Sequence, residues 1–124
     1  MKKLVFYKCQ ICGNVVVKLV DAGVPVFCCG QKMAVLDANT TDGAVEKHKP
    51  VTKIDGKTVF VQVGEVFHPM TEEHYINMIV LETNKGFAVK NLLPGQNPSA
   101  SFVLSEDEKV VAVYAYCNLH GMWA

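Results

Sequence analysis

Four cysteines form two close pairs near the start of the chain, where together they could bind one metal ion. They are Cys9 and Cys12, separated by two residues, and the adjacent pair Cys28 and Cys29. Four thiolates can surround an ion tetrahedrally, and both zinc and a single iron accept such a site. Adjacent cysteines should strain the geometry around that ion. The spacing therefore predicts a metal site and leaves zinc or iron open.

A second set of candidate ligands comprises the fifth cysteine and all four histidines. Cys117 precedes His120 by three residues, and the other histidines are placed at expected strand ends or in loops: His48, His68 and His74. Loops of a β-sandwich meet at one end, where binding groups gather on a rigid scaffold. Four imidazoles and one thiolate suit iron, copper or zinc. Five ligands around an ion that prefers six would leave one position open for catalysis.

Two other functions fit parts of this pattern. Cys117, His120 and Met122, together with one upstream histidine on a β-sandwich, resemble the copper ligands of cupredoxins, which are electron carriers. That hypothesis leaves two histidines and the N-terminal cysteines unused, and only one residue separates His120 from Met122. A structural zinc-binding interaction module is the second alternative.

Composition limits the partners of the chain. Its 124 residues carry no formal net charge, and all twelve basic residues are lysines. Absence of arginine argues against nucleic-acid binding, because arginine supplies much of the contact with bases and phosphates. No apolar run is long enough to span a membrane, and the apolar run near the start is shorter than a signal peptide requires. We therefore expect a cytoplasmic protein, in whose reducing environment clustered cysteines are more often metal ligands than disulfides.

The expected elements are strands throughout, so the fold class is all-β. Three short apolar runs, 4–9, 14–20 and 24–30, make residues 1–37 a small unit that needs a metal or a partner subunit for stability. Residues 38–124 form the second domain, which starts with a linker. Its alternating strands are arranged as three pairs, around Asp55-Gly56, Asn84-Lys85-Gly86 and 105–109, which suggests a sandwich or barrel.

Six stretches spread over the whole chain resemble the desulfoferrodoxin family of two-iron superoxide reductases: YKCQICGNVV, VFCCGQKM, EKHKPV, HPMTEEHYI, LLPGQNPSA and YCNLHGMW. The resemblance implies a small desulforedoxin-like or rubredoxin-like metal-knuckle domain, followed by an immunoglobulin-like β-sandwich of the neelaredoxin type. It also implies two iron ions per chain. The first would be bound by Cys9, Cys12, Cys28 and Cys29, and the second by His48, His68, His74 and His120 equatorially, with Cys117 axial.

The resemblance further implies one-electron reduction of superoxide to hydrogen peroxide, without release of oxygen, at the His4Cys iron. Lys47 would attract the anion, Glu46 would occupy the sixth position of the oxidised iron, and a rubredoxin-like protein would donate electrons. The apolar runs of the first domain add the expectation of a homodimer. The chain departs from the family pattern at Asn77-Met78 and Met122, which could alter packing around the second iron.

Overall fold

A computed structural model describes residues 4–39, 43 and 45–124, apart from the side chain of Glu46. The chain divides into two compact units, of which the first ends at Asp37 and the second begins at Ala38. The fold is nearly all-β, as predicted from the sequence. The described part holds no helix with the length and apolar character that crossing a membrane requires.

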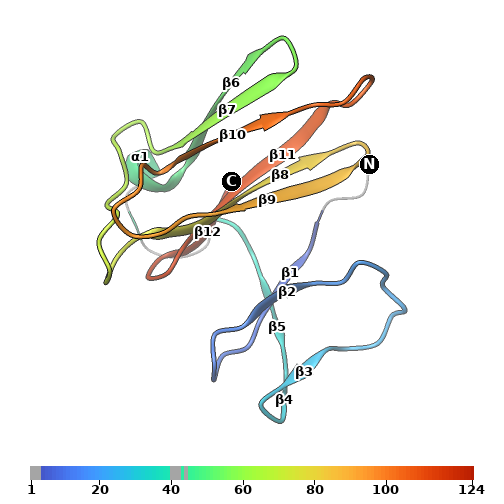
Figure 1. The fold of residues 1–124 in the computed structure, drawn as a ribbon. Helices are drawn as coiled ribbons and strands as arrows, with labels where there is room; N and C mark the ends of the chain where they lie inside the picture. Colours follow the sequence, from blue (N-terminus) through green and yellow to red (C-terminus); the bar gives the residue numbers. More distant parts are fainter. Residues whose placement is uncertain (1–3, 40–42, 44) are drawn as a thin grey trace. The chain divides into compact units, whose positions relative to one another are not determined.

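The N-terminal unit contains a three-stranded antiparallel sheet and a short hairpin (Figure 1). In the sheet, β1 (Phe6–Lys8) lies between β2 (Val15–Val17) and β5 (Ala34–Leu36). The hairpin pairs β3 (Phe27–Cys28) with β4 (Gln31–Lys32). Valines and aromatic residues recur in β1, β2 and β3, because their branched or bulky side chains suit a pleated surface. The apolar runs predicted β1, β2 and β3, whereas the short strands β4 and β5 were missed.

The C-terminal unit is a β-sandwich with two antiparallel layers, which Figure 1 shows side on. One layer has the order β10-β7-β6 and the other β12-β11-β8-β9. The elements are α1 (Val45–His48), β6 (Pro50–Asp55), β7 (Thr58–Val63), β8 (Ile76–Thr83), β9 (Gly86–Asn91), β10 (Ser99–Val103), β11 (Val110–Cys117) and β12 (Gly121–Trp123).

The buried core lies on the facing sides of the two layers. Alternate residues of β7 (Val59, Val61 and Val63) are at most 2% exposed, and so are Ile79 and Leu81 of β8. This alternation follows from the two-residue period of a strand, which points successive side chains to opposite faces. The core includes Cys117, at the end of β11.

The predicted strand pairs are confirmed for two of the three turns. Hairpins form around Gly56 and Gly86, both of which have positive φ angles. The third prediction was wrong in its pairing, because β10 pairs with β7 whereas β11 pairs with β8 and β12. The chain between β10 and β11 therefore crosses from one layer to the other. The sequence also did not predict α1 or β12, which span four and three residues.

Candidate metal centres

The two cysteine pairs of the N-terminal unit meet at one point. The ligand atoms of Cys9, Cys12, Cys28 and Cys29 all lie within 4.8 Å of one another, and none forms a disulfide. The Sγ atoms of Cys12 and Cys28 are 3.6 Å apart. Asn14 also donates its Nδ2–H to the sulfur of Cys28, at 3.7 Å.

The adjacent cysteines, Cys28 and Cys29, lie where β3 ends and the turn to β4 begins. Cys29 and Gly30 form its two central residues, and both have positive φ angles, 52° and 74°. This is the backbone pattern of a type I′ hairpin turn, which suits glycine but strains most other residues. The turn therefore places backbone strain at Cys29, whereas the expected strain in the geometry around a bound ion stays a prediction. A left-handed conformation costs a non-glycine residue about 1–2 kcal/mol.

Electrostatics show why four thiols at this spacing require a cation if all are to ionise. Backbone N–H groups of Cys12 and Ile11 lower the pKa of Cys9 to about 6. Contact with the thiols of Cys12 and Cys9 raises the pKa of Cys29 to about 12, and that of Cys28 is also raised. Negative charges on neighbouring sulfurs repel one another unless a metal ion lies between them.

In the C-terminal unit, two pairs of strands converge at the same end of the sandwich and bring the second set of candidate ligands together. Pro50 at the start of β6 pairs with Val63 at the end of β7, so His48 precedes this point and His68 follows it. Ile76 at the start of β8 likewise pairs with Cys117 at the end of β11. This places His74 beside the turn that carries Cys117 and His120.

The four imidazole rings form a square. Neighbouring rings around it have centroids 4.6–4.9 Å apart and interplanar angles of 73–88°, in the order His48, His68, His74, His120. The diagonal pair, His48 and His74, is 6.1 Å apart with the rings closer to parallel, at 31°. The ligand atoms of the four histidines and Cys117 all lie within 4.8 Å of one another.

The nitrogen atoms inside this square have the properties of metal ligands. Nε2 of His68 and Nε2 of His74 are buried and have no hydrogen-bond partner. An unsatisfied buried polar atom is costly, and native proteins rarely retain one without a function. The other ring nitrogen of His68 donates its proton to the carbonyl of Pro69, at 2.7 Å, which leaves a lone pair on Nε2. These donors therefore fit a metal ion.

Burial favours the neutral form of two of these histidines, His68 and His74, and the neutral imidazole is the form that binds metals. Burial lowers the pKa of His68 to about 4, with smaller contributions from the charges of neighbouring histidines. Burial also lowers the pKa of His74. His48 is itself only 3% exposed, and its Nε2 lies 2.9 Å from Nδ1 of His120.

Cys117 provides the sulfur of this cluster from within the hydrophobic core. Its side chain is fully buried, and Sγ lies 3.8 Å from Nδ1 of His120. Burial raises the pKa of this thiol, and hydrogen bonds from the N–H groups of His120 and Leu119 oppose that rise. A thiolate here would need an additional positive charge nearby, which a bound metal ion supplies.

The two charged residues expected to assist catalysis lie in α1. Lys47 is exposed and directly precedes His48, and its charge contributes to lowering the pKa of His74. Lys47 is therefore close enough to influence the histidine cluster electrostatically. The side chain of Glu46 lies outside the described residues, so its expected role stays a prediction.

Trp123 is a further residue of the site that the sequence did not point to. Its ring stacks on His48, with centroids 4.9 Å apart, and its Nε1–H donates to the carbonyl of His120 at 3.0 Å. It therefore fixes two candidate ligands at once. The available signal was its type and position, since the single tryptophan of the chain comes three residues after His120.

Met122, the third ligand of the cupredoxin hypothesis, lies on the wrong face of its strand. It pairs with Tyr116, whereas Cys117 pairs with Gly121. Because successive residues of a strand point to opposite faces, the side chains of Met122 and Cys117 point away from each other. Met78 also pairs with Tyr116, so two of the departures from the family pattern flank the same tyrosine.

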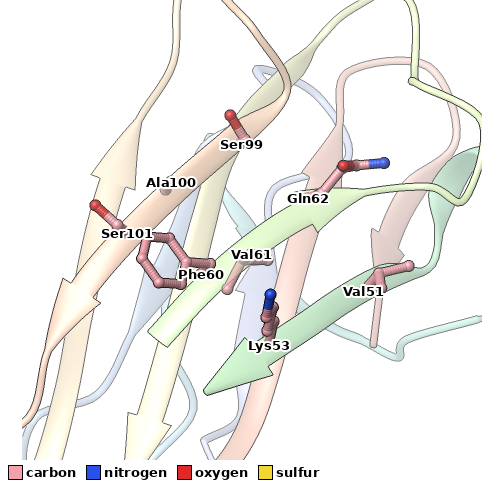
Figure 2. A pocket seen from close by; sticks show the side chains of 8 residues that line it. All are labelled: Val51, Lys53, Phe60, Val61, Gln62, Ser99, Ala100 and Ser101. Atoms are coloured by element: carbon pink, nitrogen blue, oxygen red, sulfur yellow. The ribbon is translucent and has the colours of Figure 1, made fainter. Parts of the chain in front are cut away.

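A separate hollow lies on the outer face of the β10-β7-β6 layer (Figure 2). Its apolar lining includes Phe60 and Val51, which are 47% and 44% exposed, and Lys53 is its one charged residue. The hollow is lined by Val51, Lys53, Phe60, Val61, Gln62, Ser99, Ala100 and Ser101. It contains neither histidine nor cysteine and is distinct from both clusters.

Known protein families match both units. Residues 2–36 match the family model described as the N-terminal domain of desulfoferrodoxin, and residues 40–124 match the desulfoferrodoxin model. A desulfoferrodoxin homolog from Archaeoglobus fulgidus is 45% identical over 118 residues, covering 94% of this chain and 92% of the relative.

Solved structures give the same result for the fold. The superoxide reductase of Treponema pallidum is 38% identical, covers 98% of both chains and aligns with a TM-score of 0.82. A superoxide reductase from Giardia intestinalis is 39% identical and covers 63% of this chain and 93% of its own, with a TM-score of 0.54.

Proposed function

The chain belongs to the desulfoferrodoxin family, and we propose that it is a superoxide reductase that converts superoxide to hydrogen peroxide without releasing oxygen. The observation that carries this proposal is the square of four histidines beside the buried Cys117. Relatives named superoxide reductase, among them one from Pyrococcus furiosus at 33% identity, support the activity.

In this proposal each residue of the cluster is a ligand of one iron ion. His48, His68, His74 and His120 provide four imidazole nitrogens, and Cys117 provides the fifth donor. Iron with five ligands supplies an open position and the single electron that superoxide requires. Superoxide takes up that electron and two protons to give hydrogen peroxide. Burial lowers the pKa of His68 and of His74, which keeps the lone pairs of these two imidazoles available.

Lys47 provides the positive charge that attracts the superoxide anion. It is exposed and adjacent to a proposed ligand, and the formal net charge of the chain is zero. Attraction must therefore come from locally placed lysines rather than from the overall charge. Glu46, from the same short helix, is proposed to occupy the sixth position of the oxidised iron.

A second iron is proposed at Cys9, Cys12, Cys28 and Cys29, where a rubredoxin-like protein would deliver electrons. The mutual proximity of the four sulfurs supports a single tetrahedral ion. A reducing compartment such as the cytoplasm fits this chemistry, because all five thiols must stay reduced to bind metal.

We also propose that the protein is a homodimer. The N-terminal unit exposes large apolar side chains, including Leu19 at 80% and Val20 at 86%. Its strands β2 and β5 form the two edges of the three-stranded sheet, where a second copy could add strands. Light scattering should give twice the chain mass, and a monomer across a wide concentration range would refute the dimer.

Substitution of one thiol in each cluster tests the function. Cys117→Ser should abolish superoxide reduction and the thiolate-to-iron absorption of the C-terminal centre. The matched variant Cys12→Ser should remove the N-terminal centre only, and superoxide should still be consumed by chemically pre-reduced protein. Equal activity of Cys117→Ser and the unmodified protein, each with two irons per chain, would contradict the proposal.

A further inference from the structure

His74 lies in a loop that has no regular secondary structure, and two residues hold its backbone in place. Thr71 holds it from within the loop. The N–H of Thr71 donates to the carbonyl of His74 at 3.0 Å, and its Oγ1 accepts the N–H of His74 at 3.1 Å. Without a further contact, this closed turn could still move as a body relative to the other ligands.

Asn118 makes that further contact, on both sides of His74. Its Nδ2–H donates to the carbonyl of Glu73 at 3.0 Å, and its Oδ1 accepts the N–H of Tyr75 at 2.9 Å. The backbone N–H of Asn118 also donates to the carbonyl of Tyr75, at 3.2 Å. One half-buried side chain therefore links the His74 loop to the turn that carries Cys117 and His120.

The opposite end of the same strand pair has a second asparagine with the same three bonds. Asn84 follows β8 as Asn118 follows β11. Its Nδ2–H donates to the carbonyl of Asp107 at 3.2 Å, and its Oδ1 accepts the N–H of Lys109 at 2.7 Å. Its backbone N–H donates to the carbonyl of Lys109 at 3.0 Å.

These two asparagines separate a structural role from a functional one. Each joins the end of one strand to the approach of its antiparallel neighbour, so each should stabilise the β8–β11 pair. Only the loop held by Asn118 carries a member of the histidine square, since the loop held by Asn84 belongs to neither group of potential metal ligands found among the described residues.

We propose that Asn118 is a positioning residue for the metal centre, which sets the distance between His74 and the turn with Cys117 and His120. This inference rests on the proposed function, because it assumes that these residues share one ion. His74 is 4.9 Å from His120 between ring centroids, and its buried Nε2 lacks a partner. A small shift of its loop would move that nitrogen out of the square.

Three variants of the full-length, iron-loaded protein test the inference: Asn118→Ala, Asn118→Asp and the matched control Asn84→Ala. Two quantities should be measured, the affinity of the histidine–cysteine centre for Fe²⁺ in competition with a chelator, and the thiolate-to-iron absorption of the oxidised protein. Loss of a residue that orients a ligand typically weakens metal binding by about 10–100-fold. Urea unfolding of each metal-free variant reports the purely structural effect.

Asn118→Ala should weaken Fe²⁺ binding by about tenfold or more and shift or broaden the absorption band. Asn84→Ala should lower the urea midpoint with no change in either property of the centre. Asn118→Asp should have an Fe²⁺ affinity and an absorption band between those of Asn118→Ala and the unmodified protein. Its carboxylate still accepts the N–H of Tyr75 but repels the carbonyl of Glu73. If Asn118→Ala does not fold, the comparison of Asn118→Asp with Asn84→Asp tests the inference, with the same measurements of Fe²⁺ affinity and absorption.

Unchanged Fe²⁺ affinity and absorption in the Asn118 variants would overturn the inference, and so would equal changes in the Asn84 variants. If the unmodified protein binds iron at this centre but does not reduce superoxide, the proposed function fails and the role of Asn118 is still decided. If it binds no iron there, both proposals fail.

Discussion

Replacing Gly64 with alanine would place a methyl group against the backbone that carries His48. Gly64 follows β7 and has a φ of +84°, and its N–H donates to the carbonyl of Lys49 at 3.0 Å. A Cβ atom there would clash with the carbonyl oxygen of Val66 and would lie 2.7 Å from that of Lys47. Both obstacles are backbone atoms, so no side-chain rotation relieves the clash, and the backbone at Gly64 and the backbone that leads into His48 must move apart.

The cost has two parts, which a control can separate. The left-handed conformation costs alanine about 1–2 kcal/mol relative to glycine. Overpacking at a tight site adds about 1–3 kcal/mol, which gives a total of about 2–5 kcal/mol. Gly56, in the turn between β6 and β7, has a φ of +60°, and a Cβ atom added there would meet no other atom within 4 Å. Gly56→Ala should therefore cost only the first part, about 1–2 kcal/mol.

The assay is urea unfolding of the metal-free variants, together with the iron content of the C-terminal centre after loading. We expect Gly64→Ala to be the less stable variant by about 1–3 kcal/mol and to bind less iron, whereas Gly56→Ala should bind iron normally. Equal stability of the two variants, or full iron content in Gly64→Ala, would refute the reasoning that the backbone of Lys47 leaves no room for a side chain at position 64.

Three other predictions follow from single groups. Lys47→Ala should slow the reaction with superoxide by about tenfold and reduce its dependence on salt, with iron content unchanged. Pulse radiolysis measures this rate. The same loss of rate in Lys53→Ala would show that the position of Lys47 beside His48 does not matter. The pKa of Glu108 is lowered chiefly by a hydrogen bond from Thr83. The ionised carboxylate therefore contributes to stability at pH values above the pKa of Glu108 in the unfolded chain, and this contribution is lost as pH falls through the pKa in the folded protein. Glu108→Gln should therefore lower the urea midpoint at neutral pH but have little effect in acid, and an equal loss at both would contradict this. Cys28→Ser should remove the N-terminal iron and leave the visible spectrum of the C-terminal centre intact; loss of both spectra would show that the two units depend on each other.

The local features of the fold could be predicted from the sequence, because they depend on neighbouring residues. Alternating valines predict β7, and the glycines at 56 and 86 mark the hairpin turns. Strands as short as β4 and β12 carry too few residues for a period to be recognised. The crossing between β10 and β11 depends on which layer each strand joins, and a polar turn such as 105–109 also occurs in hairpins.

The candidate site could be predicted only in part for a related reason. The cysteine pairs are close in sequence, so their spacing alone indicated a cluster. The histidines are distant in sequence and meet because β6–β7 and β8–β11 end at the same edge. Their positions at expected strand ends suggested one cluster, and the resemblance to a family gave each of them a role as a ligand. Gly64 and Asn118 gave no signal, since glycine and asparagine are common in turns and their contacts are long-range.

The central claim is that the histidine–cysteine centre reduces superoxide rather than disproportionating it. The most direct test exposes chemically pre-reduced, iron-loaded protein to a known amount of superoxide and measures hydrogen peroxide and oxygen together. Reduction predicts one hydrogen peroxide for each superoxide consumed and no oxygen from the protein reaction. Release of one oxygen for each hydrogen peroxide would contradict the account, because that ratio is the product of disproportionation.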